Sequence, residues 1–229
     1  MFPLKDHYRT SKLALITYLL ITLNVIVFVF EIFAPEPDLF IETYALIPQF
    51  VNFKNLESLY PFITSQFLHA GFLHIISNMW FLRIFGDNVE ERFGHIKYLI
   101  VYLLSGIVGG LIQYLFTPDS DIPMLGASGA VAGVLGAYLV FFPKHQIETL
   151  IPFGLFSRIV NIPASFMLVY WFVIQLFSGV GSIAYINTGG VAFWAHIGGF
   201  ACGWLIAKFY KGDIIGIVEE GEEGEILDI

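Results

Sequence analysis

Six apolar segments, each long enough to cross a lipid bilayer, constrain this chain more than any other feature of its sequence. They are residues 13–33, a run after Pro61, and residues 96–116, 125–142, 164–180 and 191–210. A bilayer core is about 30 Å thick, which about 20 helical residues span. The segments lack a two-residue alternation and exceed the length of a barrel strand, so we expect helices. Composition agrees, because 57% of the residues are hydrophobic and only 13% are charged.

These segments predict an all-α membrane protein, a bundle of six transmembrane helices formed by residues 13–210. Residues 1–12 precede the bundle, and residues 211–229 follow it as a tail. The segment 13–33 is longer than a signal-peptide core and lacks a small-x-small cleavage site, so we expect it to be retained as the first helix. Residues 34–70 form a long aromatic connection, for which we favour an aromatic belt at the membrane interface over a ligand site.

The net charge of −8 comes largely from the tail. A run of like charges with few apolar residues predicts a solvated, unstructured segment, and nothing in the chain suggests nucleic-acid binding. The acidic residues of the tail are Asp213, Glu219, Glu220, Glu222, Glu223, Glu225 and Asp228.

Basic residues gather on one side of the predicted spans. Ten of them flank the ends of the spans that lie on the same side of the membrane as the N-terminus: Lys5, Arg9, Lys12, Arg83, Arg92, Lys97, Lys144, Arg158, Lys208 and Lys211. Lys54 alone belongs to the other side. The positive-inside rule therefore predicts that both termini are cytoplasmic.

Four polar side chains stand out within the spans: His74, Asn78, Ser128 and His196. Such groups are unfavourable in a membrane, so each is a functional candidate, with helix packing as the competing explanation. Ser128 lies between Gly126 and Gly129 on a small-residue face, where packing alone is the usual reason for a serine.

His196 gives Ser128 a possible partner. It lies on a second small-residue stripe that includes Gly199 and Gly203, and two such stripes favour close helix contact. Counting residues from the expected helix starts places Ser128 about 5 Å and His196 about 8 Å below the same surface. A neutral histidine that accepts the serine proton would make Ser128 a nucleophile.

His74 and Asn78 are four residues apart and share one helical face. A helix that begins near Gly71 places them level with Ser128, where they and the Ser128 N–H could stabilise an oxyanion. An interhelical hydrogen bond explains them equally well. A metal site is less favoured, because His69 and His74 are poorly spaced and lack a carboxylate or thiolate cluster. We expect no cofactor, and the single Cys202 is a packing residue.

The sequence resembles the rhomboid intramembrane serine proteases. The resemblance rests on HAGFLHIISN, GDNVEERFG, GASGAVAGVLGAY and AHIGG, and it extends from LNVIVFVFE in the first span to about Tyr210. It implies a dyad of Ser128 as nucleophile and His196 as general base, with His74 and Asn78 in the oxyanion hole. Glu90 and Arg92 match a Glu-x-Arg motif that is usually structural, although a juxtamembrane salt bridge also fits two exposed charges.

One position departs from the family pattern. Some members carry a tyrosine four residues after the nucleophile, packed on the catalytic imidazole, whereas this chain has Ala132. The sequence also offers no obvious acceptor for the second nitrogen of His196.

The resemblance implies hydrolysis of peptide bonds in or next to transmembrane segments, through an acyl-enzyme. Substrates would be membrane proteins that enter past the fifth helix, where Trp171 and Phe172 could form a gate, although each alone is expected to face lipid. We expect a prokaryotic cell membrane with the active site toward the extracytoplasmic face. The alternatives are a non-proteolytic rhomboid-like binding factor and a transporter, but the inverted repeats of a transporter are not found.

Overall fold

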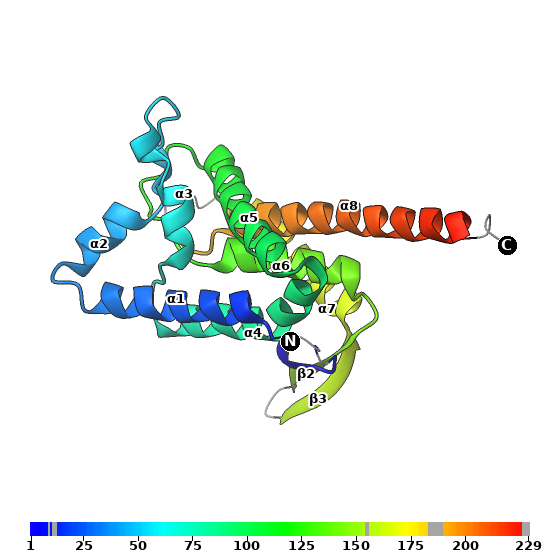
Figure 1. The fold of residues 1–229 in the computed structure, drawn as a ribbon. Coiled ribbons are helices and arrows are strands. Elements are labelled where there is room, and N and C mark those ends of the chain that lie inside the picture. The colour runs from blue at the N-terminus through cyan, green and yellow to red at the C-terminus, as the bar shows by residue number, and fades with distance from the viewer. Residues whose placement is uncertain (9, 11–12, 154–155, 183–189, 226–229) are drawn as a thin grey trace.

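The computed structural model describes the chain except residues 9, 11–12, 154–155, 183–189 and 226–229. Arg9, Lys12 and Asp228, which entered the charge analysis, therefore lie outside the described residues. Six long helices dominate the structure (Figure 1): α1 (Leu15–Ile32), α4 (Phe72–Phe93), α5 (His95–Phe116), α6 (Ser128–Phe141), α7 (Ala164–Ser182) and α8 (Phe193–Glu225). The structure is mostly helical, as expected, although the sheet described below departs from a purely all-α fold.

Among the described residues, three of these helices, α1, α5 and α7, are long and apolar enough to cross a membrane. α6 is apolar but has only 14 residues. α4 carries charged residues in its second half, among them Arg83 and Asp87. A count of six transmembrane spans therefore stays a prediction.

α6 forms the centre of the bundle. It packs against α8, α5 and α4, and every residue from Gly129 to Tyr138 is buried. A Cβ atom on Gly199 of α8 would overlap the carbonyl oxygen of Gly129, and one on Gly136 would overlap that of Phe200. The two small-residue stripes thus bring the backbones of α6 and α8 into contact, as their spacing predicted.

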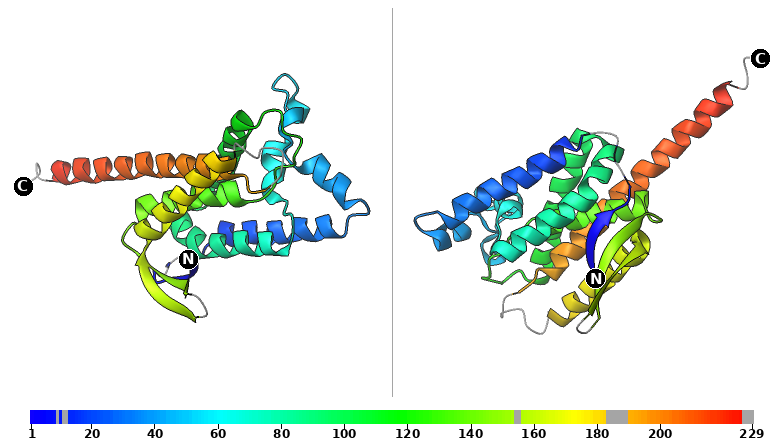
Figure 2. Two further views of the ribbon diagram at one scale, coloured as in Figure 1. Left: turned by 180° about the vertical axis from the view of Figure 1, so that it is seen from behind. Right: turned by 90° about the horizontal axis from the view of Figure 1, so that it is seen from below.

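A three-stranded antiparallel sheet lies at one end of the helices (Figure 2), which the sequence analysis did not predict. Its strands are β1 (Phe2–Asp6), β2 (Gln146–Phe153) and β3 (Phe156–Pro163), in the order β1-β2-β3. β2 and β3 form a hairpin from Gln146 opposite Pro163 to Phe153 opposite Phe156, and β1 adds on with Phe2 opposite Leu150. Ile147 and Thr149 of β2 are fully buried, so one face of this strand packs against the rest of the protein.

Residues 34–70 fold into short helical turns instead of a plain loop. They comprise α2 (Pro37–Tyr44), α3 (Pro61–Thr64) and 3-10 turns at Pro48–Phe50, Leu56–Ser58 and Ser65–Phe67. α4 then begins at Phe72, directly after Gly71, in the helical register that the sequence analysis preferred.

The tail differs from the prediction. We expected an unstructured segment from residue 211, but α8 continues as a helix to Glu225 and projects beyond the bundle (Figure 1). Backbone hydrogen bonds within one helix need no tertiary partner, and this allows the helix to continue past the packed region.

Candidate active site

Ser128 is the first residue of α6, not a residue about one turn inside it as the sequence analysis expected. Gly126, two residues before α6, has a φ of +127°, a conformation that favours glycine and is not helical, and its N–H donates to the Ser65 carbonyl at 2.8 Å. Residues before it are held by a pair of backbone hydrogen bonds between Met124 and Leu46, at 2.8 and 2.9 Å. Ser128 therefore lies at a helix N-terminus, where backbone N–H groups have no partner within the helix.

His196 lies in the first turn of α8 and is buried. Its Nε2 is 2.8 Å from Ser128 Oγ, so the two side chains that the sequence analysis paired are within hydrogen-bond distance. Its Nδ1 is 2.8 Å from Oε1 of Gln175 on α7. The imidazole thus connects residues from three helices.

Gln175 was not among the site residues predicted from the sequence. It lies within the apolar segment 164–180, so the rule that singled out His196 and Asn78 would also have selected this amide. Its partner could not be inferred, because the loop between α7 and α8 leaves their relative position open to the sequence.

His74 and Asn78 line the same cavity as Ser128 and His196, which has a volume of about 560 Å³. A Cβ atom on Gly126 would stand 2.7 Å from His74 Cε1 and 3.6 Å from Ser128 Oγ, so the His74 ring lies beside the serine. The backbone N–H of Ala70 donates to His74 Nδ1 at 3.4 Å, an arrangement that leaves Nε2 protonated and able to donate.

Asn78 is buried, and its Nδ2 has no hydrogen-bond acceptor among the described residues. A buried amide without a partner is unfavourable by about 1 to 3 kcal/mol. Asn78 therefore keeps a free donor at the cavity that contains Ser128.

Trp171 and Phe172 both contact α8, which corrects the expectation that each faces lipid. The Trp171 ring lies 5.9 Å from the His196 ring at 33° and lines the cavity. Phe172 stacks on Phe200 at 4.6 Å. Some family members pack a tyrosine on the catalytic imidazole from the position of Ala132. In this chain the Trp171 ring packs on the His196 imidazole instead.

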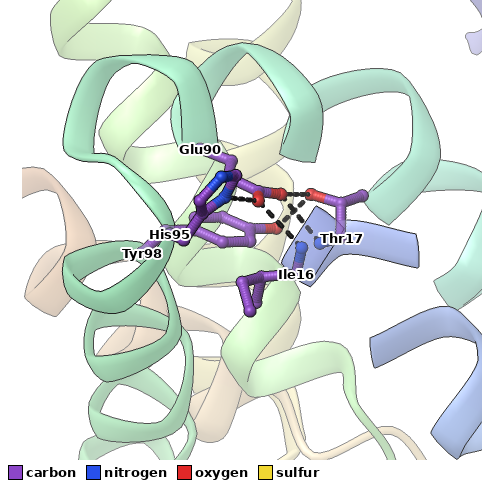
Figure 3. Close-up of polar contacts among 5 residues, drawn as sticks. All are labelled: Ile16, Thr17, Glu90, His95 and Tyr98. Carbon is purple, nitrogen blue, oxygen red and sulfur yellow. Dashed lines mark hydrogen bonds and ion pairs between the residues drawn. The ribbon is translucent and has the colours of Figure 1, made fainter. Parts of the chain in front are cut away.

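Glu90 is neither exposed nor paired with Arg92, so the salt-bridge interpretation is wrong. Glu90 is buried at the start of α1 (Figure 3), where Oε1 accepts from the Ile16 N–H at 2.8 Å and Oε2 from the Thr17 N–H at 2.8 Å. It also accepts from the Thr17 hydroxyl at 2.7 Å and contacts His95 Nδ1 at 2.5 Å. The carboxylate satisfies free N–H groups of the α1 N-terminus, where negative charge is favourable.

Arg92 instead lies over the Phe141 ring, 5.5 Å from its centre. The two residues of the motif thus act at different places: Glu90 joins α4 to α1, and Arg92 contacts the end of α6.

His69 is fully buried, with its ring centre 5.1 Å from that of His74. It lies in the connection before α4, where burial lowers the pKa of its imidazole to about 4, so it is neutral near pH 7. Within the described residues, no three His, Cys, Asp or Glu side chains come together as metal ligands.

The chain is similar to known rhomboid proteins. A model of the Rhomboid domain matches residues 56–212, a range that contains all the cavity residues discussed above. The chain is 32% identical over 144 residues to RHOMBOID-like protein 6, mitochondrial, of Arabidopsis thaliana, covering 63% of this chain and 41% of that protein. It is 35% identical over 109 residues to the putative rhomboid protease YdcA of Bacillus subtilis, covering 43% of this chain and 54% of that protein.

A third relative is Rhomboid-like protease 3 of Toxoplasma gondii, 39% identical over 92 residues, which cover 40% of this chain and 33% of that protein. The chain thus matches only part of the length of these relatives. Since the Rhomboid model covers most of the chain and the helices are apolar, this integral membrane protein belongs to the rhomboid family.

Proposed function

We propose that this protein is an intramembrane serine endopeptidase that hydrolyses peptide bonds in or next to the transmembrane segments of other membrane proteins. The observation that carries the proposal is the 2.8 Å distance between Ser128 Oγ and His196 Nε2, within a cavity lined by further polar donors. The name of the Bacillus relative, a putative rhomboid protease, agrees with this chemistry.

The reaction starts when His196 Nε2 takes the proton of Ser128 as Oγ attacks the substrate carbonyl carbon. The resulting oxyanion accepts hydrogen bonds from the Ser128 N–H, the Asn78 amide and His74 Nε2–H. The C–N bond then breaks, and His196 gives its proton to the leaving amine. Water deprotonated by His196 hydrolyses the acyl-enzyme, which releases the new carboxyl end and restores the Ser128 hydroxyl.

Two features of the cavity support oxyanion stabilisation. The start of α6 carries unpaired N–H groups and the positive end of the helix dipole. Asn78 Nδ2 has no acceptor among the described residues, so it can donate to a substrate without breaking an existing bond.

The substrate must be locally extended at the cleavage site, because a continuous helix keeps its carbonyls in hydrogen bonds. Small residues there follow from the family resemblance. Since Trp171 of α7 lines the cavity, entry past α7 would bring a substrate directly to Ser128.

The active site is proposed to face the extracytoplasmic side of a prokaryotic cell membrane. Ser128 is at the first residue of α6, whereas the sheet that follows the other end of α6 includes the basic Lys5 and Arg158. The positive-inside rule assigns that basic end to the cytoplasm.

The test uses the full chain in detergent or liposomes, with a fluorophosphonate probe and a transmembrane substrate. Ser128→Ala should abolish both labelling and cleavage, and His196→Ala should reduce cleavage severely. Ser157→Ala, on the exposed strand β3, is the control and should retain both. Client binding without Ser128-dependent cleavage would contradict the proposal and support a non-proteolytic rhomboid-like binding factor.

A further inference from the structure

Gln175 joins the dyad to a third helix. Its Oε1 lies 2.8 Å from His196 Nδ1, and the opposite ring nitrogen lies 2.8 Å from Ser128 Oγ. Gln175 is exposed over only 8% of its surface, so water competes little for this contact. Three side chains from α7, α8 and α6 therefore form one continuous hydrogen-bonded chain.

We propose that Gln175 is a positioning residue that holds His196 in the tautomer and orientation required for proton transfer from Ser128. This inference rests on the proposed protease function. It assigns to a neutral amide the task that a carboxylate performs in a serine-histidine-aspartate triad.

The tautomer follows from the hydrogen-bonding capacity of the two groups. A neutral imidazole has one N–H and one bare nitrogen, and an amide oxygen can only accept. With Oε1 against Nδ1, the proton is on Nδ1, and Nε2 keeps the lone pair that accepts the Ser128 proton. If the amide were rotated so that its NH₂ group faced Nδ1, Nδ1 would have to accept a hydrogen bond. The ring proton would then be on Nε2, which could no longer accept the Ser128 proton.

The same contact favours the product of proton transfer. When Nε2 gains the serine proton, the ring becomes cationic and both nitrogens donate. The Gln175 oxygen still accepts from Nδ1–H, whereas an amide NH₂ group there would repel it.

A glutamine also suits this environment better than a carboxylate. An ionised carboxylate inside a membrane protein is unfavourable, whereas an amide offers an acceptor without a net charge. Gln175 can therefore fix the ring without the desolvation of an ion.

Trp171 completes the support of His196 from α7. It lies four residues before Gln175, and so on the same helical face, and its ring lies 5.9 Å from the imidazole. Gln175 holds the ring at its edge, and Trp171 limits movement at its face. Together these two side chains of α7 restrain the His196 ring, which Ala132 of α6 is too small to do.

The first experiment compares wild-type protein with Gln175→Leu, which removes the acceptor. We expect kcat for a transmembrane substrate to fall about 10- to 100-fold, the range seen for residues that orient metal-bound histidines, with KM nearly unchanged. The control Gln113→Leu alters an α5 glutamine with a bond to Thr117 of its own segment, and it should retain wild-type kcat. Wild-type kcat in folded Gln175→Leu would overturn the proposal.

A second readout is independent of turnover. In protein labelled with [¹⁵N]histidine, nitrogen NMR distinguishes the two imidazole tautomers of His196. The wild-type spectrum should show the proton on Nδ1, and Gln175→Leu should show a mixture. Should the wild-type protein lack Ser128-dependent cleavage, the protease proposal fails, but an Nδ1–H that depends on Gln175 still supports the positioning role. An unchanged spectrum in Gln175→Leu would refute it.

Gln175→Glu provides a test that preserves the side-chain size. A protonated glutamic acid can donate its O–H to Nδ1, which leaves Nε2 without a lone pair, whereas an ionised glutamate can only accept, as the Gln175 oxygen does. Cleavage should therefore rise with pH more steeply in this variant than in wild type. Besides His196, the titratable side chain among the described cavity residues is His74. It is present in both the wild type and Gln175→Glu, so it cannot cause a difference between their pH profiles. Superimposable pH profiles would contradict a contact between residue 175 and the base.

Discussion

Gly203 of α8 lies against Gly133 of α6 so closely that a Cβ atom on Gly203 would overlap the Gly133 carbonyl oxygen. The two helices meet backbone to backbone along this contact. Ser128 and His196 lie near the starts of the same two helices, Ser128 about one and a half turns and His196 about two turns from the contact. The close approach therefore sets the distance at which the hydroxyl and the imidazole meet.

Gly203→Ala should lower the free energy of unfolding by about 1 to 3 kcal/mol, because the added methyl group must separate two packed backbones. Cleavage should also fall, because separation of the two helices lengthens the distance between Ser128 Oγ and His196 Nε2. Thermal unfolding in detergent and cleavage of a transmembrane substrate measure the two effects. Gly181→Ala is the matched control, since a Cβ there meets no atom within 4 Å. Equal stability of the two variants would argue against the close contact.

Gly126→Ala should reduce catalysis by displacing His74. The new Cβ would stand 2.7 Å from His74 Cε1, at a backbone position with φ of +127°. The kcat for a transmembrane substrate measures this loss. Gly71→Ala separates the two causes, because its φ is +155° but a Cβ there meets no atom within 4 Å. A similar loss of kcat in both variants would exclude a specific role for His74.

Glu90→Gln should destabilise the protein more than Arg92→Ala does. The amide of glutamine has one oxygen for the four donors near Glu90, so buried N–H groups of α1 lose their partner, which costs about 1 to 3 kcal/mol. Arg92 is exposed and contacts a ring, an interaction worth about 0.5 to 1 kcal/mol. Thermal unfolding of both variants decides the comparison, and an equal loss would indicate that the two residues share one role.

Asn78→Ala distinguishes an oxyanion donor from a packing residue. Loss of one donor should lower kcat about 10²- to 10³-fold with little change in KM. Stability should stay the same or rise, because a buried amide whose Nδ2 has no acceptor among the described residues is removed. Steady-state kinetics and thermal unfolding on the same preparation provide both numbers. A marked loss of stability with intact kcat would favour the interhelical hydrogen bond.

The sequence by itself determined the helices, their polar residues and the faces on which they touch. Length and apolar composition predict α1, α5 and α7, and the four-residue spacing of Gly129, Gly133, Gly199 and Gly203 predicts the contact of α6 with α8. These features are local, because they depend on the residues within one helix and the medium around it.

Only the tertiary structure decided where those helices begin and what their polar groups meet. Ser128 opens α6 because Gly126 is held by Ser65, far away in the chain, and no pattern near Ser128 contains that contact. Glu90 caps α1 across 74 residues, and β1 pairs with a hairpin near residue 150. The partner of His196 was decided in the same way, since Gln175 meets it only when α7 packs on α8. Contacts between distant segments depend on how whole helices pack, and the chain order alone leaves that packing open.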